Sequence, residues 1–324
     1  MKSIYMEDAE FIACLESIEW NKFKEKIFLI TGSTGMIGRT IVNALIVANC
    51  KQHLNLKLIC IVRDLAKAQK RLPKSDAIIF KSDSIEEKIK LEENIDFIVH
   101  AANPTSSSFF VNNPVETIKV GIKGTMNLLD LSVEKCIKGF VFLSSMEVYG
   151  YPDKGHRVTE KEVAGFDTSV VRNCYPISKQ ICESLCKAYQ SEYGVPTKIL
   201  RLTQTFGPGV EFGDNRVFAE FMRCVIKKKN IILRTSGSTE RCYLYTADAV
   251  SAILIVLTKG KPGESYTVAN PDTYCSILDM AKLVAQDITN NDIKVHVTMD
   301  EIERGYANEL HMLLDTTKLE ALGW

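Results

Sequence analysis

Three spaced glycines between an apolar strand and a helix constrain the fold of this chain more than any other feature. Residues 26–48 read KIFLITGSTGMIGRTIVNALIVA, and glycine stands at the two turn positions and at the start of the helix. Glycine permits the tight turn and lets the main chain approach a pyrophosphate, which the free N–H groups of the helix N-terminus favour. The pattern therefore predicts a dinucleotide-binding turn. Its candidate residues are Gly32, Thr34, Gly35, Met36, Ile37 and Gly38.

Strands and helices alternate through the first two thirds of the chain. Short apolar runs predict strands at 27–30, 57–63, 77–80, 96–102, 139–145 and 197–202. Helices are predicted between them at 64–72, 84–91 and 113–135, with another that begins near residue 175. This alternation is typical of a parallel sheet covered on both faces. We therefore expect an α/β fold with a Rossmann-like, doubly wound parallel sheet.

The chain divides into three parts on this pattern. Residues 1–25 contain a predicted helix at 6–18 and form an N-terminal helical appendage. Residues 26–203 form the dinucleotide-binding domain, to which 242–268 return. Residues 204–241 and 269–324 lack a regular strand–helix rhythm and are expected to form a smaller substrate-binding region. Its helices are predicted at 216–229, 275–286 and 315–322.

The charge balance of the sequence argues against nucleic acid and membrane surfaces as partners. The 324 residues contain 40 Lys plus Arg and 40 Asp plus Glu, so no excess charge points to nucleic acid or to a membrane surface. No run of ~18 apolar residues occurs, and we expect a soluble, cytoplasmic protein without a signal peptide. Among the ten cysteines, Cys182 and Cys186 do not have the usual zinc spacing, so reduced thiols and no metal site are expected.

The end of the second predicted strand bears on the choice of dinucleotide. It reads IVRD, where an acid usually holds the ribose hydroxyls of NAD. Asp64 suits the 2′-hydroxyl of NAD, whereas Arg63 suits the 2′-phosphate of NADP, and both cofactors stay open. Asp83, after the third strand, either meets the adenine or caps its loop. Ala101 and Ala102, at the end of the fourth strand, are further candidate cofactor contacts.

Tyr175 and Lys179 are four residues apart on a predicted helix, so that they share one face. A cation beside a phenol favours the phenolate and lowers the phenol pKa from its ordinary value of ~10, which suits acid–base chemistry near neutral pH. Ser145 ends the fifth strand, where ligands bind in such sheets, and is expected to contact a substrate hydroxyl. Glu147 follows as a candidate acid, base or polar anchor.

In this order, the three glycines, Ser145 and the Tyr175–Lys179 pair resemble the short-chain dehydrogenase/reductase superfamily. The chain is more narrowly similar to the extended branch, the NAD-dependent epimerase/dehydratase family of nucleotide-sugar enzymes, over residues 26–324. The segments SSMEVYG, VRNCYPISK, TFGPGV, GSTERCYLYTADAV and DTTKLEALGW resemble UDP-glucuronate decarboxylases and sugar-nucleotide dehydratases most.

The resemblance implies roles for single residues. Tyr175 would take a proton from a sugar hydroxyl while hydride passes to the nicotinamide of NAD. Lys179 would lower the pKa of Tyr175 and hold the nicotinamide ribose, and Ser145 would orient the substrate. The implied substrate-binding residues are Ser145, Arg172, Gln204, Arg216 and Arg241. The family also implies a homodimer formed by the helices near 113–133 and 175–192.

Departures from the family pattern narrow the reaction. Met146 stands where 4,6-dehydratases carry an acid. Met312 stands where glucuronate decarboxylases carry an arginine that binds the substrate carboxylate, and this role is lost unless Arg304 or Arg172 supplies the charge. We therefore expect an NAD(P)-dependent oxidoreductase or epimerase acting on a nucleotide-activated sugar. An NADPH-dependent reductase of a nucleotide-linked keto sugar and a UDP-glucuronate decarboxylase are alternatives. A protein that senses the dinucleotide without catalysis is an alternative of a different class.

Overall fold

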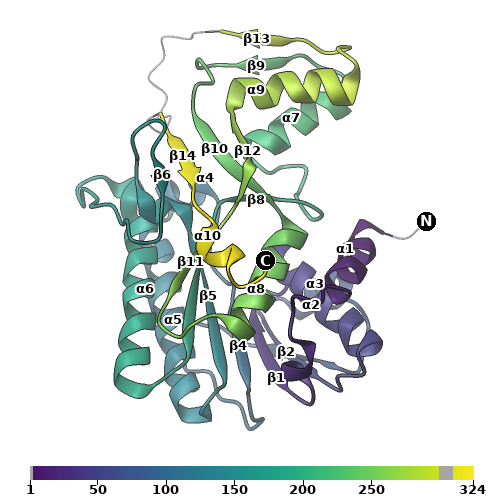
Figure 1. The fold of residues 1–324 in the computed structure, drawn as a ribbon, viewed down its shortest axis with the longest axis vertical. Coiled ribbons are helices and arrows are strands. Elements are labelled where there is room, and N and C mark those ends of the chain that lie inside the picture. Colours follow the sequence, from purple (N-terminus) through teal and green to yellow (C-terminus); the bar gives the residue numbers. More distant parts are fainter. Residues whose placement is uncertain (1–2, 299–308) are drawn as a thin grey trace.

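A seven-stranded parallel sheet forms the centre of the computed structural model, which describes residues 3–298 and 309–324 (Figure 1). Its strands are β1 (Ile27–Thr31), β2 (Lys57–Val62), β3 (Ile78–Ser82), β4 (Phe97–His100), β5 (Gly139–Ser145), β7 (Thr197–Leu202) and β11 (Ser265–Val268). They are ordered β11-β7-β5-β4-β1-β2-β3, and every neighbouring pair is parallel. The strand order runs outward from β1 in both directions, which confirms the doubly wound fold.

Helices cover both faces of this sheet because consecutive strand residues point to opposite sides. Phe28 and Ile30 of β1 pack into one buried cluster, whereas Leu29 packs into another. The first face is covered by α2 (Met36–Lys51), α3 (Leu65–Arg71) and α8 (Thr246–Lys259). The second face is covered by α5 (Pro114–Lys135) and α6 (Cys174–Tyr193).

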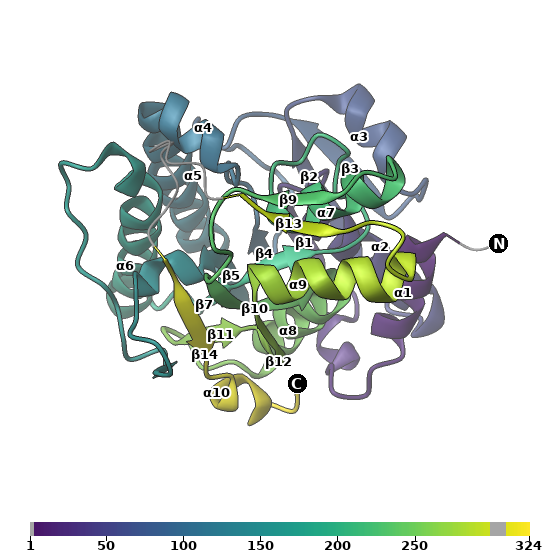
Figure 2. The ribbon, with the colours of Figure 1, turned by 90° about the horizontal axis from the view of Figure 1, so that it is seen from above.

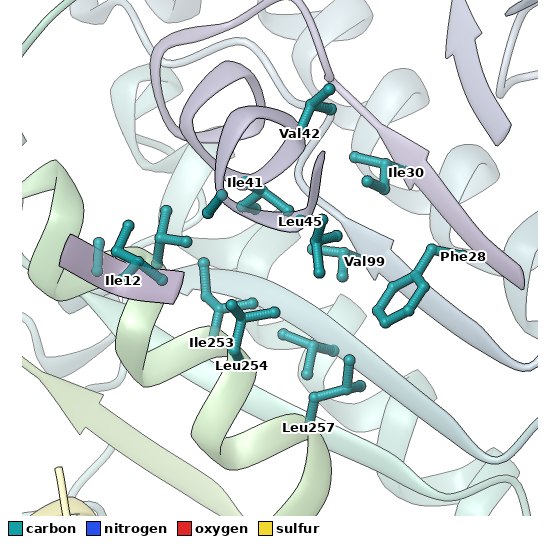
Figure 3. Packing of buried hydrophobic residues seen from close by; sticks show 14 of the residues in the cluster. Ile12, Phe28, Ile30, Ile41, Val42, Leu45, Val99, Ile253, Leu254 and Leu257 are labelled. Carbon is teal, nitrogen blue, oxygen red and sulfur yellow. The ribbon is translucent and has the colours of Figure 1, made fainter. Parts of the chain in front are cut away.

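The N-terminal segment belongs to the main core. Helix α1 (Ile4–Ala13) is followed by a 3-10 turn, η1 (Trp20–Phe23). Ile12 and Phe23 are fully buried in the cluster that α2 and α8 form with the sheet, and Figure 3 shows Ile12 near Ile253 of α8. The ring of Phe23 lies 5.0 Å from that of Phe28. The segment expected to be an appendage therefore completes the buried cluster on one face of the main sheet.

Replacing Ile12 by valine is expected to lower the free energy of unfolding by about 0.5–1.5 kcal/mol, because it removes a buried methyl group and leaves a cavity. Phe11→Ala, one residue away, is the control because the Phe11 side chain is 56% exposed. Urea unfolding followed by circular dichroism measures both variants. Equal losses in the two variants would contradict the burial of α1 in the main core.

The remaining strands form a second region above the carboxyl edge of the main sheet (Figure 1). One mixed sheet has the order β12-β10-β14-β6 with β8 paired to β10, and a separate pair joins β13 to β9. These strands are β6 (Arg157–Val158), β8 (Gln204–Phe206), β9 (Ile231–Leu233), β10 (Glu240–Tyr245), β12 (Asn270–Ser276), β13 (Val295–Val297) and β14 (His311–Leu314).

Short helices complete the second region and the connections. Figure 2 shows α7 and α9 beside the β9–β13 pair, with which they share a buried cluster. The elements are α4 (Ser107–Asn112), η2 (Met146–Tyr149), η3 (Val171–Asn173), α7 (Val217–Ile226), α9 (Ile277–Leu283), a π-helical turn η4 (Val284–Ile288) and α10 (Thr317–Glu320). In the part of the chain that the structure describes, no helix has the length and apolar character needed to cross a membrane.

The helix predicted at 84–91 is wrong. This segment is a loop whose apolar side chains, Ile85 and Ile89 among them, are buried against the face that α5 covers. The Asn127 amide donates to the carbonyl oxygens of Ile85 and Glu87 at 2.8 and 3.0 Å. The loop therefore gains side-chain partners for its main chain from a distant helix, which helical periodicity in the sequence does not reveal.

Candidate active site

A cavity of about 610 Å³ lies at the carboxyl ends of the parallel strands, below the second region. The β1–α2 turn, the ends of β4 and β5, and the first turns of α6 all contribute to its wall. Arg216 contributes from the second region. The cavity is therefore at the edge of the sheet where open α/β folds bind ligands.

The glycine turn is built for a close approach of the main chain. Gly32 has a φ of +69°, and a Cβ atom there would lie 2.8 Å from the main chain of Ala101. A Cβ atom on Gly38 would collide with the carbonyl oxygen of Gly32. Gly35, Met36 and the first turn of α2 reach the cavity wall, so that free helix N–H groups lie beside it. The turn fits the pyrophosphate of a dinucleotide.

Arg63 and Asp64 have different surroundings at the end of β2. Arg63 lies on the cavity wall, whereas Asp64 does not. The Asp64 carboxylate caps α3 by accepting the Lys67 N–H at 2.9 Å. Asp83 lies on the wall and also caps its own loop, since its Oδ1 accepts the Ser84 N–H at 2.8 Å.

The residues that follow β4 pack against the glycine turn. Ala101 and Ala102 lie on the wall, as predicted, and the Ala102 N–H donates to Thr31 Oγ1 at 3.2 Å. The next residue, Asn103, was not predicted. This residue contributes to the wall, and its buried Oδ1 atom accepts no hydrogen bond from the described residues. Its place three residues after the end of a parallel strand is the sequence signal that could have identified it.

Tyr175 and Lys179 both face the cavity from the first turns of α6, and both are almost fully buried. The Tyr175 ring stacks on Phe110 of α4, with ring centres 4.1 Å apart. Lys179 Nζ lies 5.8 Å from the centre of the Tyr175 ring and donates to the Leu143 carbonyl oxygen at 2.7 Å. The spacing in the sequence thus predicted that the two side chains lie on one face of the helix, but it gave no sign of Phe110 or of the hydrogen bond from Lys179 to Leu143.

The pKa of Tyr175 is raised above its ordinary value. Burial is the main cause, and the Glu147 carboxylate adds to it, while hydrogen bonding to Ser145 and the charge of Arg172 act in the opposite direction. The prediction from the sequence that the Tyr175 pKa is lowered is therefore wrong. Burial outweighs any effect of the Lys179 amine, which is directed to the carbonyl group of Leu143.

Burial also controls the charge of Lys179. It lowers the pKa of the Lys179 amine to about 8, and the nearby Glu183 carboxylate works against this shift. His100, below the site, is fully buried between Thr31 and Thr125, and burial lowers its pKa to about 3. His100 is therefore neutral at pH 7, and Lys179 changes its charge close to neutral pH.

Wild-type protein is expected to gain stability relative to Lys179→Met as the pH rises from about 8 to about 10. The amine releases its proton near pH 8 when folded and near 10.5 when unfolded, so the unfolded state binds more protons in this window. Each pH unit can add up to about 1.4 kcal/mol to the difference in unfolding free energy. Urea unfolding of both proteins across this range measures it, and a flat difference would show that Lys179 keeps its proton.

Ser145 and Glu147 come from the end of β5 and from η2. Both lie on the cavity wall, and Ser145 Oγ accepts the Glu147 N–H at 3.2 Å. Glu147 Oε2 pairs with Arg172 Nη2 at 3.0 Å. The Arg172 guanidinium also lies 5.1 Å from the centre of the Phe110 ring. Arg172 is therefore held next to the cavity by Glu147, although it does not line the wall itself.

The other predicted substrate residues have different positions. Gln204 and Arg216 lie on the wall, where Arg216 pairs with Asp214 at 2.6 Å. Arg241 lies away from the wall, and its buried Nε atom has no hydrogen-bond partner among the described residues. Met312, paired in register with Arg241, is buried in the core of the second region. Arg304 lies outside the described residues.

Comparison with known proteins adds family relationships to this geometry. A model of the "NAD dependent epimerase/dehydratase family" matches residues 28–269. UDP-glucuronic acid decarboxylase 1 of Xenopus tropicalis is 27% identical over 266 residues, which are 81% of this chain and 60% of that protein. The chain thus spans less than two thirds of the length of this curated relative.

Two solved structures share the fold. UDP-glucose 4-epimerase of Thermotoga maritima, determined with UDP-glucose, superposes with a TM-score of 0.76 and 24% identity, over 92% of this chain and 93% of that one. An epimerase of Methanothermobacter thermautotrophicus gives a TM-score of 0.80 and 19% identity, over 99% of this chain and 89% of that one. At these identities the structures support the fold alone.

Proposed function

The chain belongs to the NAD-dependent epimerase/dehydratase family, and we propose on this basis that it is an enzyme that oxidises or reduces a nucleotide-activated sugar. One observation carries the proposal. Tyr175, Lys179 and Ser145 face the same cavity as the glycine turn. A proton-transfer group and a dinucleotide-binding turn therefore share one site, which a protein that only senses the dinucleotide would not need.

Each side chain of the site has a separate role in the proposed reaction. When bound, NAD supplies the acceptor for a hydride from a sugar carbon. Tyr175 Oη takes the proton of the sugar hydroxyl, and Ser145 Oγ orients that hydroxyl. The Lys179 ammonium stabilises the negative charge that develops on Tyr175, which compensates for the raised pKa of the buried phenol. Arg216, on the wall of the cavity, is suited to the phosphates of the nucleotide.

The cavity wall at the end of β2 affects whether NAD or NADP binds. NAD is the cofactor that the family name indicates. Arg63 lies on the wall while Asp64 caps α3, an arrangement that also accommodates the 2′-phosphate of NADP. Binding constants of Arg63→Ala for the two cofactors distinguish them. A loss confined to NADP assigns Arg63 to the phosphate.

Epimerisation or keto reduction is the chemistry that the site residues favour. Met146 cannot donate a proton to a leaving hydroxyl, so the site lacks the acid that dehydration needs. The buried Met312 supplies no charge, so the site lacks an arginine at the position where decarboxylases carry one. Decarboxylation stays the second candidate because Arg172 is held beside the cavity by Glu147, where a guanidinium could bind a sugar carboxylate. The curated relative named above supports the same alternative.

We also propose a cytoplasmic homodimer. Apolar side chains on the outer faces of α5 and α6 support the dimer, since Val115, Met126 and Ile181 are 63%, 40% and 41% exposed. Leu128 and Leu131 of α5 are buried inside the protomer and therefore do not contribute to this surface. Size-exclusion chromatography with light scattering tests the dimer.

Mass spectrometry tests the reaction. Purified protein is incubated with UDP-, CDP-, GDP- and dTDP-sugars, with and without added NAD or NADPH. A product of unchanged mass but different retention indicates epimerisation, a gain of two hydrogens indicates reduction, and loss of CO₂ indicates decarboxylation. No product from any sugar, in protein that binds the dinucleotide, would overturn the proposal.

A further inference from the structure

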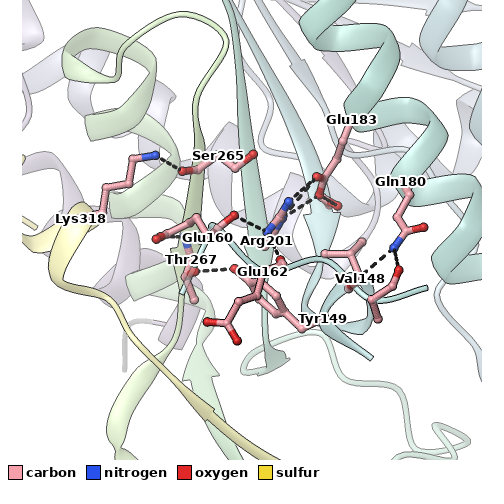
Figure 4. A network of polar contacts seen from close by, with 12 residues as sticks. Val148, Tyr149, Glu160, Glu162, Gln180, Glu183, Arg201, Ser265, Thr267 and Lys318 are labelled. Carbon is pink, nitrogen blue, oxygen red and sulfur yellow. Dashed lines mark hydrogen bonds and ion pairs between the residues drawn. The ribbon is translucent and has the colours of Figure 1, made fainter. Parts of the chain in front are cut away.

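A buried ion pair lies directly behind the catalytic side chains. Arg201 of β7 is 1% exposed and meets Glu183 of α6 through two of its nitrogens, with Nη2 2.7 Å from Oε2 and Nε 3.0 Å from Oε1 (Figure 4). Glu183 is one helical turn after Lys179. The pair is therefore part of the same helix face that carries the catalytic amine.

The same pair reaches the strand that carries Ser145. Ser144 Oγ donates to Glu183 Oε1 at 2.6 Å, so the carboxylate joins the end of β5 to α6. Arg201 Nη1 donates to the carbonyl oxygens of Glu160 and Glu162 at 3.1 and 3.2 Å. This guanidinium thereby fixes the segment that follows β6 as well.

The third connection reaches η2, which carries Glu147. The Arg201 guanidinium lies 4.9 Å from the centre of the Tyr149 ring. Tyr149 OH in turn shares a hydrogen bond of 2.6 Å with Thr267 Oγ1 of β11. Each element that presents a candidate catalytic group, β5, η2 or α6, therefore contacts the Glu183–Arg201 pair or a direct partner of it.

We propose that Glu183 and Arg201 are positioning residues, which set the distance between the Ser145 hydroxyl and the Tyr175–Lys179 face of α6. The inference rests on the proposed function for its catalytic consequence. A buried ion pair often adds little to stability compared with apolar side chains of the same volume. The pair joins β5, η2 and α6, so it can fix the relative positions of the groups that these elements carry. Such positioning matters because misplacing a reacting group by about 1 Å can cost about 100-fold in rate.

The pH at which the Lys179 amine titrates reports on the nearby Glu183 carboxylate, and it can be measured without turnover. The titratable groups that face the Lys179 amine are Tyr175, Cys182, Glu183 and Cys186 on its own helix and His100 on β4. Glu183 is the one carboxylate among these groups. Removing its charge while Arg201 stays in place is expected to lower the midpoint at which Lys179 titrates, by about one unit.

The decisive comparison separates stability from geometry. Glu183→Gln leaves the Arg201 charge buried without a partner, so it is expected to lose both thermal stability and rate, with kcat reduced about 10- to 100-fold. Adding Arg201→Met removes the second charge and should restore the melting temperature while kcat stays low. Recovery of kcat together with the melting temperature would overturn the proposal, because the pair would then be structural only.

Ser144→Ala keeps the proposal testable if the double variant does not fold. It removes one hydrogen bond from a small buried side chain, and is expected to reduce kcat about 3- to 10-fold with the melting temperature nearly unchanged. Lys318→Met is the control, since it breaks an ion pair with Glu264 at 2.8 Å and a hydrogen bond to the Ser265 carbonyl oxygen at 2.7 Å, neither of which involves β5, η2 or α6. Wild-type kcat in Ser144→Ala would contradict the positioning role.

NMR titration of isotope-labelled lysine, assigned with Lys179→Arg, completes the experiment in ligand-free protein. A lowered Lys179 midpoint in Glu183→Gln and an unchanged one in Lys318→Met are expected. An unchanged midpoint in both would overturn the proposal. Absence of turnover in wild-type protein would instead refute the proposed function, and the titration would still test the positioning of Lys179.

Discussion

Tyr175→Phe is expected to reduce kcat by about 10²- to 10⁴-fold, the usual contribution of a positioned general acid or base. The substitution removes only the hydroxyl, and the phenylalanine ring keeps its stacking on Phe110, so the fold and the cavity should be preserved. The dissociation constant of the dinucleotide should change little, because the glycine turn is untouched. Initial rates with the sugar identified by mass spectrometry measure the loss.

The matched control is Tyr189→Phe, on the same helix. The Tyr189 hydroxyl donates to Asp130 at 2.6 Å on the outer side of α6, and it does not line the cavity. Its removal should leave kcat within about 2-fold of the wild type, since surface changes rarely alter stability by more than about 0.5 kcal/mol. Wild-type activity in Tyr175→Phe would refute the assignment of the phenol to proton transfer.

Gly38→Ala is expected to weaken dinucleotide binding at least about 100-fold and to destabilise the protein. A Cβ atom at position 38 would collide with the carbonyl oxygen of Gly32, so either α2 or the turn must move. A shift of the turn removes the free N–H groups from the pyrophosphate site. Isothermal titration calorimetry with NAD and NADP measures the affinity, and thermal unfolding measures the stability.

Gly165→Ala supplies the control for this change. A Cβ atom at Gly165 would meet no atom within 4 Å in the described structure, and its φ lies outside the left-handed region. This variant should bind the dinucleotide with wild-type affinity. Tight binding by Gly38→Ala would contradict the assignment of the turn, because the close packing of α2 against β1 would then have no part in holding the ligand.

The sequence predicted the parts of the site that local spacing determines. Tyr175 and Lys179 share a helix face because they are four residues apart, and Ser145 reaches the cavity because it ends a parallel strand. The glycine spacing located the turn at the start of α2. These features follow from helix periodicity and from the direction of parallel strands.

Long-range contacts explain what the sequence did not predict. Asp64 was one of two candidates for the cofactor ribose at the end of β2, and nothing in the sequence indicated that its carboxylate caps α3. Phe110 lies on Tyr175 because α4 folds over the first turn of α6, a contact that joins residues far apart in the chain. The raised pKa of Tyr175 depends on how completely the phenol is buried, and spacing alone does not determine burial.

Absorbance at 340 nm during a single turnover tests the proposed hydride transfer at the Tyr175 site, since it follows the reduced nicotinamide itself. Protein loaded with NAD is mixed rapidly with the nucleotide sugar that mass spectrometry identifies, and protein loaded with NADPH is mixed with the matching keto sugar. We expect a rise in absorbance in the first case or a fall in the second, which Tyr175→Phe slows by at least about 100-fold. Product formation at the wild-type rate in Tyr175→Phe, or no absorbance change in protein that binds both ligands, would contradict it.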